Sequence, residues 1–164
     1  MTAAPKLQNP LLDKTLINSF IDGVSKTLKT MANTDLTYGK PYVEQKFAAR
    51  GEIAGVVGMV SNQYKATLTL SFPKPAILLI LENMLGEKHT DISAEVFDAV
   101  GELTNMIYGS AKATLNDLGY NFEMAIPTVI QGQFIMLQHS KSATLVIPFK
   151  LTNQAEFFIE ISVY

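Results

Sequence analysis

The sequence contains no cysteine and no tryptophan among its 164 residues. Without cysteine, disulfide bonds, thiol catalysis and thiolate-bound metals are all excluded. Charged residues make up only 17% of the chain, and the net charge is −2 at pH 7. Because a nucleic-acid binder needs a basic surface to neutralise phosphates, this charge argues against a nucleic-acid partner.

Long hydrophobic runs are also missing. The most hydrophobic run, residues 76–81, is too short to cross a bilayer, and the opening MTAAPKLQNP lacks the apolar core of a signal peptide. We therefore expect a cytoplasmic protein without a membrane partner. The 48% hydrophobic content suits a single domain over residues 1–164, with residues 1–10 as a loose lead-in.

Hydrophobic periodicity predicts the secondary structure. Apolar residues recur at helical spacing over residues 11–32, 76–85 and 92–118, and Ser93 and Gly119 are placed to cap and to end the third helix. Segments typical of strands cover residues 42–48, 52–60, 64–72, 122–131, 142–150 and 156–163, with a short extension at 133–137. Gly55 and Gly58 weaken the second strand, which a bulge or a close-packed neighbour would explain.

The two halves of the chain resemble each other. Each has a helix, then a proline-led segment (PYVEQKF at 41–47, PTVIQGQF at 127–134), then two strands joined at SNQ (61–63) or TNQ (152–154). We infer an internally duplicated helix-plus-three-strand unit, with the helix at residues 73–85 as the connector. The predicted fold class is α+β, with two layers: an antiparallel-rich sheet covered by helices.

The helix over residues 92–118 has two different faces. At about 100° per residue, one face is an apolar stripe and the other a polar ridge. The expected stripe is Val96, Val100, Leu103, Ile107, Ala111 and Leu118, and the ridge is Asp98, Glu102, Asn105, Gly109, Lys112 and Asn116. Glu102 and Asn105 are three residues apart, so their side chains project together. This pair is the main functional candidate.

The neighbours of this pair suggest contact with a partner. Gly109 lies one turn beyond Asn105, where a missing side chain would let another backbone approach, and glycine in a helix interior costs roughly 1 kcal/mol relative to alanine. Gly101 raises the same question. Asp98 and Lys112 are candidates for contacts at the rim.

The duplication also indicates how many sites the chain has. Aligned on aspartates, Asp98, Glu102 and Asn105 match Asp13, Ile17 and Phe20 of the first helix. An apolar pair then stands where the polar pair should be, so one site per chain is predicted.

A purely structural interpretation stays open beside the functional one. Exposed helix faces that carry charged and amide groups are usually only solvated, and Pro127 could be a simple break at a strand edge. His89 and His139 lack a set of further ligands, so we expect solvent exposure rather than metal binding. Five methionines are expected to fill the core or an interface: Met59, Met84, Met106, Met124 and Met136.

The motif resembles a known family. Asp98-x3-Glu102-x2-Asn105, followed after 21 residues by Pro127, is similar to the signature of the CheC/CheX/FliY phosphatases of bacterial chemotaxis, most of all to CheX members. CheC-type members carry the Glu-x2-Asn pair in both helices and CheX members in one. The helix and strand layout is similar from about residue 11 to residue 164.

The resemblance implies an enzyme that hydrolyses the phospho-aspartate of a CheY-type response regulator. Asn105 would orient the attacking water, and Glu102 would pair with a lysine of the regulator. The Mg²⁺ would belong to the regulator, so the protein would need no cofactor or metal of its own. The resemblance also implies a homodimer formed through sheet edges, with residues 53–60 as a candidate contributor.

Two other functions remain as alternatives. The middle domain of the flagellar switch protein FliM resembles this fold and docks without hydrolysis, which would make the chain a binding module. The Glu102/Asn105 pair argues against that, because a scaffold does not need it. A phosphatase for small molecules ranks lower, because the sequence shows no nucleophile motif, metal cluster or phosphate loop.

Overall fold

The computed structural model describes residues 13–45, 50–132 and 143–163. Three helices and seven strands make up this part of the chain. The helices are α1 (Lys14–Ala32), α2 (Lys74–Leu85) and α3 (Ala94–Asp117). The strands are β1 (Leu36–Tyr38), β2 (Tyr42–Glu44), β3 (Ile53–Val60), β4 (Lys65–Phe72), β5 (Thr128–Gln131), β6 (Thr144–Leu151) and β7 (Glu156–Val163). The predicted α+β fold class is confirmed.

The strands form one antiparallel sheet in the order β1-β6-β7-β4-β3-β5, and β2 also pairs with β6. The hairpins β3–β4 and β6–β7 meet along the central pair of β4 and β7. The short strands cross between the halves: β5 of the second half pairs with β3, whereas β1 and β2 of the first half pair with β6. This exchange is the arrangement expected of a duplicated unit, and Pro41 and Pro127 each directly precede a short exchanged strand.

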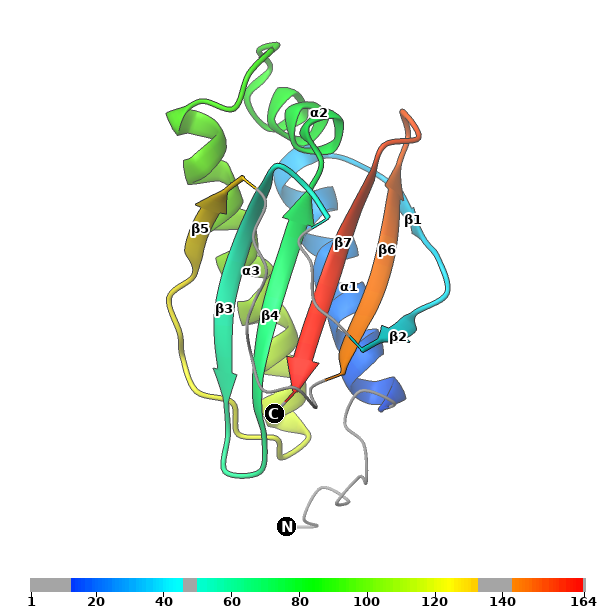
Figure 1. Ribbon diagram of the computed structural model, residues 1–164, viewed down its shortest axis with the longest axis vertical. Helices are drawn as coiled ribbons and strands as arrows, with labels where there is room; N and C mark the ends of the chain where they lie inside the picture. Colours follow the sequence, from blue (N-terminus) through cyan, green and yellow to red (C-terminus); the bar gives the residue numbers. More distant parts are fainter. Residues whose placement is uncertain (1–12, 46–49, 133–142, 164) are drawn as a thin grey trace.

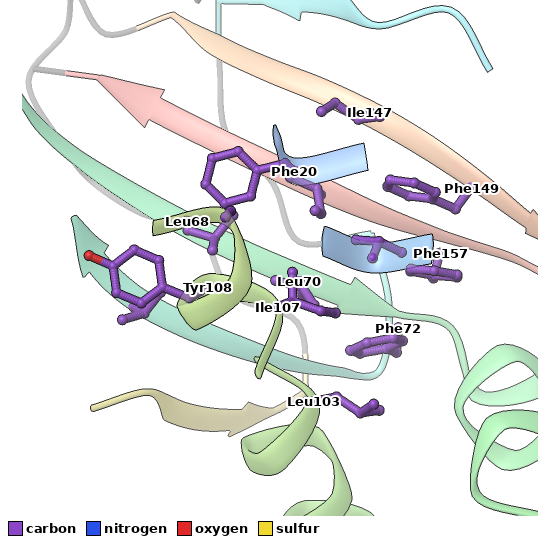
Figure 2. Close-up of a cluster of buried hydrophobic side chains, with 14 of the residues drawn as sticks. Phe20, Leu68, Leu70, Phe72, Leu103, Ile107, Tyr108, Ile147, Phe149 and Phe157 are labelled. Atoms are coloured by element: carbon purple, nitrogen blue, oxygen red, sulfur yellow. The ribbon is translucent and has the colours of Figure 1, made fainter. Parts of the chain in front are cut away.

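The helices cover one face of the sheet, with α1 and α3 behind the strands and α2 across one end (Figure 1). Strand residues alternate between the two faces, so every second side chain points toward the helices. Figure 2 shows this core, where Phe20 of α1 and Ile107 of α3 lie over Leu68 and Leu70. Phe157 stacks between Phe72 and Phe149.

Two close approaches fix the position of α3. A Cβ at Gly23 of α1 would lie 3.3 Å from the carbonyl oxygen of Ile107, so the two long helices are in near-backbone contact. A Cβ at Gly55 of β3 would lie 1.9 Å from Oγ1 of Thr104, so α3 rests directly on the sheet. The close-packed neighbour expected at Gly55 is therefore Thr104, whereas a Cβ at Gly58 would have no atom within 4 Å.

The helices of the two repeats align in a different register from the predicted one. Asp13 and Ser93 both occupy the N-cap position, and on this alignment the buried residues of the first four turns coincide except at Ile21, whose counterpart is the partly buried Gly101. These are Leu16, Ser19, Phe20, Gly23, Val24, Thr27 and Leu28 in α1, and Val96, Ala99, Val100, Leu103, Thr104, Ile107 and Tyr108 in α3.

The match of Ile17 and Phe20 to the functional pair was therefore wrong. Phe20 is fully buried, whereas Asn105 is exposed, so the two cannot be equivalent positions. Glu102 and Asn105 instead correspond to Asp22 and Ser25, a shorter acid and a hydroxyl. A shared aspartate misled the sequence alignment, because the pattern of burial determines the register of a helix.

Several segment boundaries also differ from the predictions. The predicted strand over residues 122–131 is a strand only from Thr128, and β1 was not predicted. Ser93 holds the N-cap position of α3 but its side chain makes no capping hydrogen bond. Residues 1–12, His139, Met136, and the extension at 133–137 lie outside the described residues, as does part of the predicted strand 42–48.

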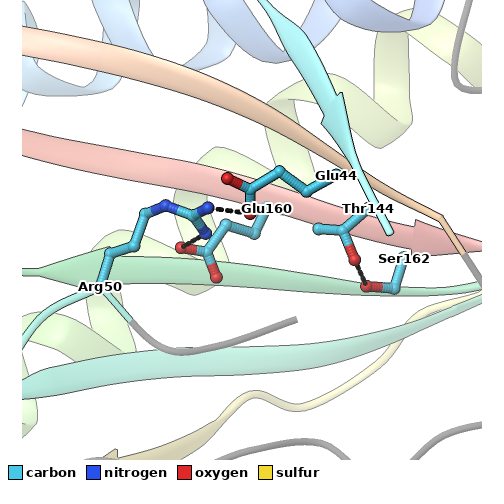
Figure 3. Close-up of polar contacts among 5 residues, drawn as sticks. All are labelled: Glu44, Arg50, Thr144, Glu160 and Ser162. Carbon is cyan, nitrogen blue, oxygen red and sulfur yellow. Dashed lines mark hydrogen bonds and ion pairs between the residues drawn. The ribbon is translucent and has the colours of Figure 1, made fainter. Parts of the chain in front are cut away.

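The face of the sheet away from the helices carries a buried polar cluster (Figure 3). Arg50 bonds Glu160 of β7 at 3.1 Å and also pairs with Glu44 of β2, and the hydroxyls of Thr144 and Ser162 lie 2.8 Å apart. Glu160 is fully buried. Burial raises the pKa of Glu160 to about 7, and the guanidinium of Arg50 limits the rise.

Candidate functional site

The long helix α3 carries the predicted site on its outer face. Its inner face is buried as predicted from Val96 to Ala111, and Tyr108 and Leu115 join it. Leu118 was expected in this stripe but is 51% exposed, because α3 ends at Asp117 and Gly119 follows with a left-handed φ of 93°. The core stripe therefore stops one turn earlier than predicted.

Asp98, Glu102 and Asn105 lie on the opposite face and are exposed. None of these three side chains makes a hydrogen bond or ion pair with another described residue. Within the described part of the chain their polar groups are therefore available to a partner. The structure brings the predicted pair together on one ridge of α3.

Two shallow hollows flank this ridge. The first is lined by Asn105, Tyr108, Gly109, Lys112, Ala113, Asn116, Met124 and Ala125. The second lies between α2 and α3 and is lined by Leu81, Met84, Leu85, Glu95, Asp98, Ala99 and Glu102. Asn105 and Glu102 thus border different hollows and stand between them. A raised ridge with a hollow on each side suits the surface of another protein better than an enclosed small molecule.

The charges along the ridge are separated. Glu95, Asp98 and Glu102 lie toward the N-terminal half of α3, and Lys112 lies toward the C-terminal half. Neutral Asn105 lies between them. A partner that fits this face therefore needs basic groups near the start of α3 and acidic groups near Lys112.

The two glycines of α3 differ in what surrounds them. A Cβ at Gly101 would contact Cγ2 of Val129 in β5 at 3.5 Å, an ordinary packing distance. A Cβ at Gly109 would have no atom within 4 Å. Packing within the described part of the chain therefore does not require glycine at position 109.

Pro127 directly precedes β5 and is partly buried. It lacks an amide hydrogen, which an edge strand tolerates at its start. β5 then runs along β3, and Val129 in it reaches Gly101 of α3. Pro127 is thus connected to α3 through β5, but it does not line either hollow.

Two residues that the sequence did not single out shape the first hollow. The hydroxyl of Tyr108 donates to the carbonyl of Glu123 at 2.7 Å. Asn116, predicted only as part of the polar ridge, accepts from the amide of Phe122 at 2.6 Å and donates to its carbonyl at 2.9 Å. Burial and the nearby charge of Glu123 raise the pKa of Tyr108, so its hydroxyl keeps its proton. No local sequence pattern marks these contacts.

His89 was expected in solvent, but its side chain is only 17% exposed and Nε2 lies 3.4 Å from a carboxylate oxygen of Glu95. His89 therefore contacts a residue that lines the second hollow. Met59 is buried as expected, whereas Met124 is 87% exposed. Within the described ranges there is no cluster of three or more metal-binding side chains, and no helix is both long and apolar enough to span a membrane.

Comparison with known proteins finds relatives that are CheX or CheC-like proteins. Residues 53–150 match the family model for the chemotaxis phosphatase CheX. A CheC-like superfamily protein from Shewanella sp. PV-4 is 40% identical, with 93% of this chain and 99% of that chain covered and a TM-score of 0.84. The CheY-P phosphatase CheX of Thermotoga maritima is 24% identical over 153 residues, which cover 93% of this chain and 97% of that protein.

A more distant structure shares the fold. It is the complex of CheX with CheY, BeF3 and Mg²⁺ from Borrelia burgdorferi, 22% identical with a TM-score of 0.75, covering 90% of this chain and 97% of that chain. The family match spans more than half of this sequence, and the Shewanella relative covers nearly all of it. The chain belongs to the CheX family of chemotaxis phosphatases.

Proposed function

We propose that this protein is a phosphatase that accelerates hydrolysis of the phospho-aspartate on a CheY-type response regulator. The observation that carries the proposal is the exposed and unpaired Glu102/Asn105 pair on a ridge suited to a protein surface. Its membership of the CheX family supports the same reaction. The distant relative from Borrelia burgdorferi supports the choice of partner, because it was solved together with CheY and Mg²⁺.

Asn105 is proposed to position the attacking water. The water oxygen attacks phosphorus in line with the departing aspartate oxygen, which releases inorganic phosphate and restores the carboxylate of the regulator. A carboxamide can accept a hydrogen bond from the water and donate one to a phosphoryl oxygen, and it adds no negative charge near the phosphoryl group. Phosphoryl transfer depends mainly on positioning and charge stabilisation. One oriented amide group can therefore accelerate the hydrolysis.

Glu102 is proposed to anchor the regulator rather than to act as a base. Its exposed carboxylate lies one turn before Asn105 and can form an ion pair with a lysine of the regulator. That pair would hold α3 in register, so that Asn105 enters the site beside the phosphoryl group. The acidic neighbours of Glu102 favour the same basic partner surface.

Asp98, Gly109 and Lys112 are proposed as further contacts. Asp98 lies one turn before Glu102 and extends the acidic half of the ridge. Lys112 borders the same hollow as Asn105 and suits an acidic rim on the regulator. The open space at Gly109 leaves room for the partner backbone to approach α3 closely. Pro127 is proposed to have a structural role, through the start of β5.

The metal is proposed to come with the substrate. Mg²⁺ held by the regulator would neutralise charge on the phosphoryl oxygens, and this chain would supply no ligand to it. Such regulators act inside the cell, so the proposed location is the cytoplasm.

A homodimer through a sheet edge is also proposed. β5 pairs with β3 only from Ile53 to Val56. On that side of β3 no described strand pairs with Val57–Val60, although the carbonyl of Val60 accepts from the amide of Glu123. The proposed homodimer contact is therefore limited to the part of β3 that β5 does not cover, Val57–Val60.

The test is phosphate release from a phosphorylated CheY-type regulator with catalytic amounts of this protein. Asn105→Ala should slow the stimulated reaction by something on the order of 10²-fold at saturating regulator. Asn105→Asp should be at least as slow, because its charge repels the phosphoryl group. Ser25→Ala, at the equivalent position of α1, is the matched control and should keep full activity. Unimpaired release with Asn105→Ala would remove Asn105 from the mechanism.

A further inference from the structure

The segment of residues 122–126, between α3 and β5, exposes two large apolar side chains. Met124 is 87% exposed and Ile126 is 91% exposed, the highest values among large hydrophobic residues of the described chain. Figure 1 shows the segment rising from the end of α3 beside β3 to reach β5. Single exposed apolar residues are common on proteins, but two so close in sequence, one of which lines the hollow beside Asn105, need a reason.

The backbone of this segment is held in place at several points. Asn116 bonds both the amide and the carbonyl of Phe122, and Tyr108 bonds the carbonyl of Glu123. The amide of Glu123 in turn donates to the carbonyl of Val60 at 2.8 Å. The side chain of Phe122 is buried and stacks on Tyr120. These bonds fix residues 122 and 123, and the exposed side chains of Met124 and Ile126 follow directly after this anchored pair.

The anchoring residues belong to the helix that carries the candidate site. Tyr108 and Asn116 both lie on α3, and they line the same hollow as Asn105, Gly109 and Met124. A molecule that fills this hollow therefore contacts both Asn105 and Met124. Met124 and Asn105 are thus both positioned by α3, Met124 through the bonds that α3 makes to residues 122 and 123.

We propose that Met124 and Ile126 form an apolar docking contact for the phosphorylated response regulator, next to its phosphorylated aspartate. This inference rests on the proposed function. The two side chains would pack against apolar residues of the regulator and set how tightly it binds, without taking part in the chemistry. Because the bonds to α3 already order residues 122 and 123, less backbone entropy is lost when the regulator binds beside them.

A second copy of this chain is a poorer occupant for the contact. A copy seated over Met124 would also cover Asn105 and Lys112, which line the same hollow, and would block the proposed reaction. A bound regulator, by contrast, would cover the apolar side chains and also bring its phosphorylated aspartate to Asn105. Lys112 supplies the charged border that a rim of acidic residues would match.

The test compares Met124→Ser/Ile126→Ser with the wild type in steady-state phosphate release. The expected result is an increase in KM of about tenfold or more, with kcat within about twofold, since loss of a central apolar contact weakens binding by at least that factor. Met124→Leu/Ile126→Leu keeps the apolar area and should restore the KM. Tyr38→Ser is the matched control, because Tyr38 is 57% exposed on β1 at the opposite edge of the sheet. Thermal unfolding should show that every variant remains folded.

Direct titration with a regulator carrying BeF3 and Mg²⁺ separates this inference from the proposed function. Weaker binding of the serine variant supports the docking contact even if the wild type releases no phosphate. An unchanged KM and unchanged binding would overturn it, as would a fall in kcat at constant KM. A serine variant that becomes monomeric while the wild type is dimeric would assign the contact to a second copy instead. A wild type that does not bind any regulator would overturn both proposals.

Discussion

The hydroxyl of Tyr120 donates to the carboxylate of Asp13, although the two residues are 107 positions apart. Asp13 is the N-cap of α1 and accepts from the amide of Thr15 at 2.9 Å, and it is nearly buried. Tyr120 follows the C-terminus of α3. This single contact therefore ties the start of one repeat helix to the end of the other.

Tyr120→Phe should destabilise the fold by about 1–2 kcal/mol, because a buried carboxylate loses a hydrogen-bond donor while its capping role remains. Burial and the bond to Asp13 raise the pKa of Tyr120, so the contact should persist to high pH. Urea unfolding of the two proteins measures the difference. Tyr64→Phe is a suitable control, because Tyr64 stacks on the same ring at 6.3 Å. Equal losses in both variants would show that the Asp13 contact contributes nothing specific.

Glu102→Gln should weaken regulator binding and leave the chemical step largely intact. Hydrogen bonds to a charged group contribute roughly 1.5–3 kcal/mol, so the KM should rise by about tenfold or more while kcat changes little. Steady-state phosphate release separates the two constants. Asp22→Asn, at the equivalent position of α1, should match the wild type. A large fall in kcat with constant KM would instead assign Glu102 to the reaction itself.

Gly109→Ala should make the protein more stable and less active. The added methyl meets open space, and alanine is favoured over glycine in a helix interior by roughly 1 kcal/mol. If a partner backbone approaches α3 at this point, the same methyl should raise the KM for the regulator. Chemical unfolding and steady-state kinetics measure the two effects.

Gly55→Ala provides the contrast, because its methyl would collide with Thr104. Overpacking of this kind costs about 1–3 kcal/mol, so this variant should lose stability. A Gly109→Ala protein with wild-type KM would mean that no partner atom comes close to position 109.

Glu160→Gln tests the raised pKa of Glu160. The folded pKa of about 7 lies above the unfolded value near 4.5, so the native state binds more protons between these limits. The contribution of Glu160 to stability is therefore present below pH 4.5 and is lost as pH rises through 7. Relative to Glu160→Gln, the wild type should lose up to about 3 kcal/mol of unfolding free energy between pH 4.5 and about pH 8.

Urea unfolding at several pH values measures this change. Arg50, which pairs with Glu160, keeps its positive charge across this range. A difference between wild type and variant that does not depend on pH would mean that Glu160 is ionised throughout.

Features that depend on nearby residues were predictable from the sequence. The helical spacing of apolar residues located α3 and its exposed pair. The segments typical of strands at residues 64–72 and 156–163 located the central strands. The prolines before the short strands and the matching turns revealed the duplication. The resemblance to a family motif then pointed to Glu102 and Asn105 among several polar residues.

Features that depend on contacts between residues far apart in the sequence could not be predicted from the sequence. Residues 122–127 were predicted as part of a strand, but bonds from Asn116 and Tyr108 hold residues 122 and 123 in an irregular path. β1 has only three residues and exists through its pairing with β6. The buried carboxylate of Glu160 pairs with Arg50, 110 positions away. A period-two or period-3.6 pattern contains no information about such partners.

The exchange of short strands has a consequence for the origin of the chain. A single repeat would contain a hairpin and a short strand that cannot pair with that hairpin, because β1 and β2 lie on β6 and β5 lies on β3. An ancestral protein with one repeat could complete this sheet only by trading strands between two molecules. Gene fusion would then have converted a strand-swapped dimer into one chain, and left each copy of the helix free to diverge toward its own use.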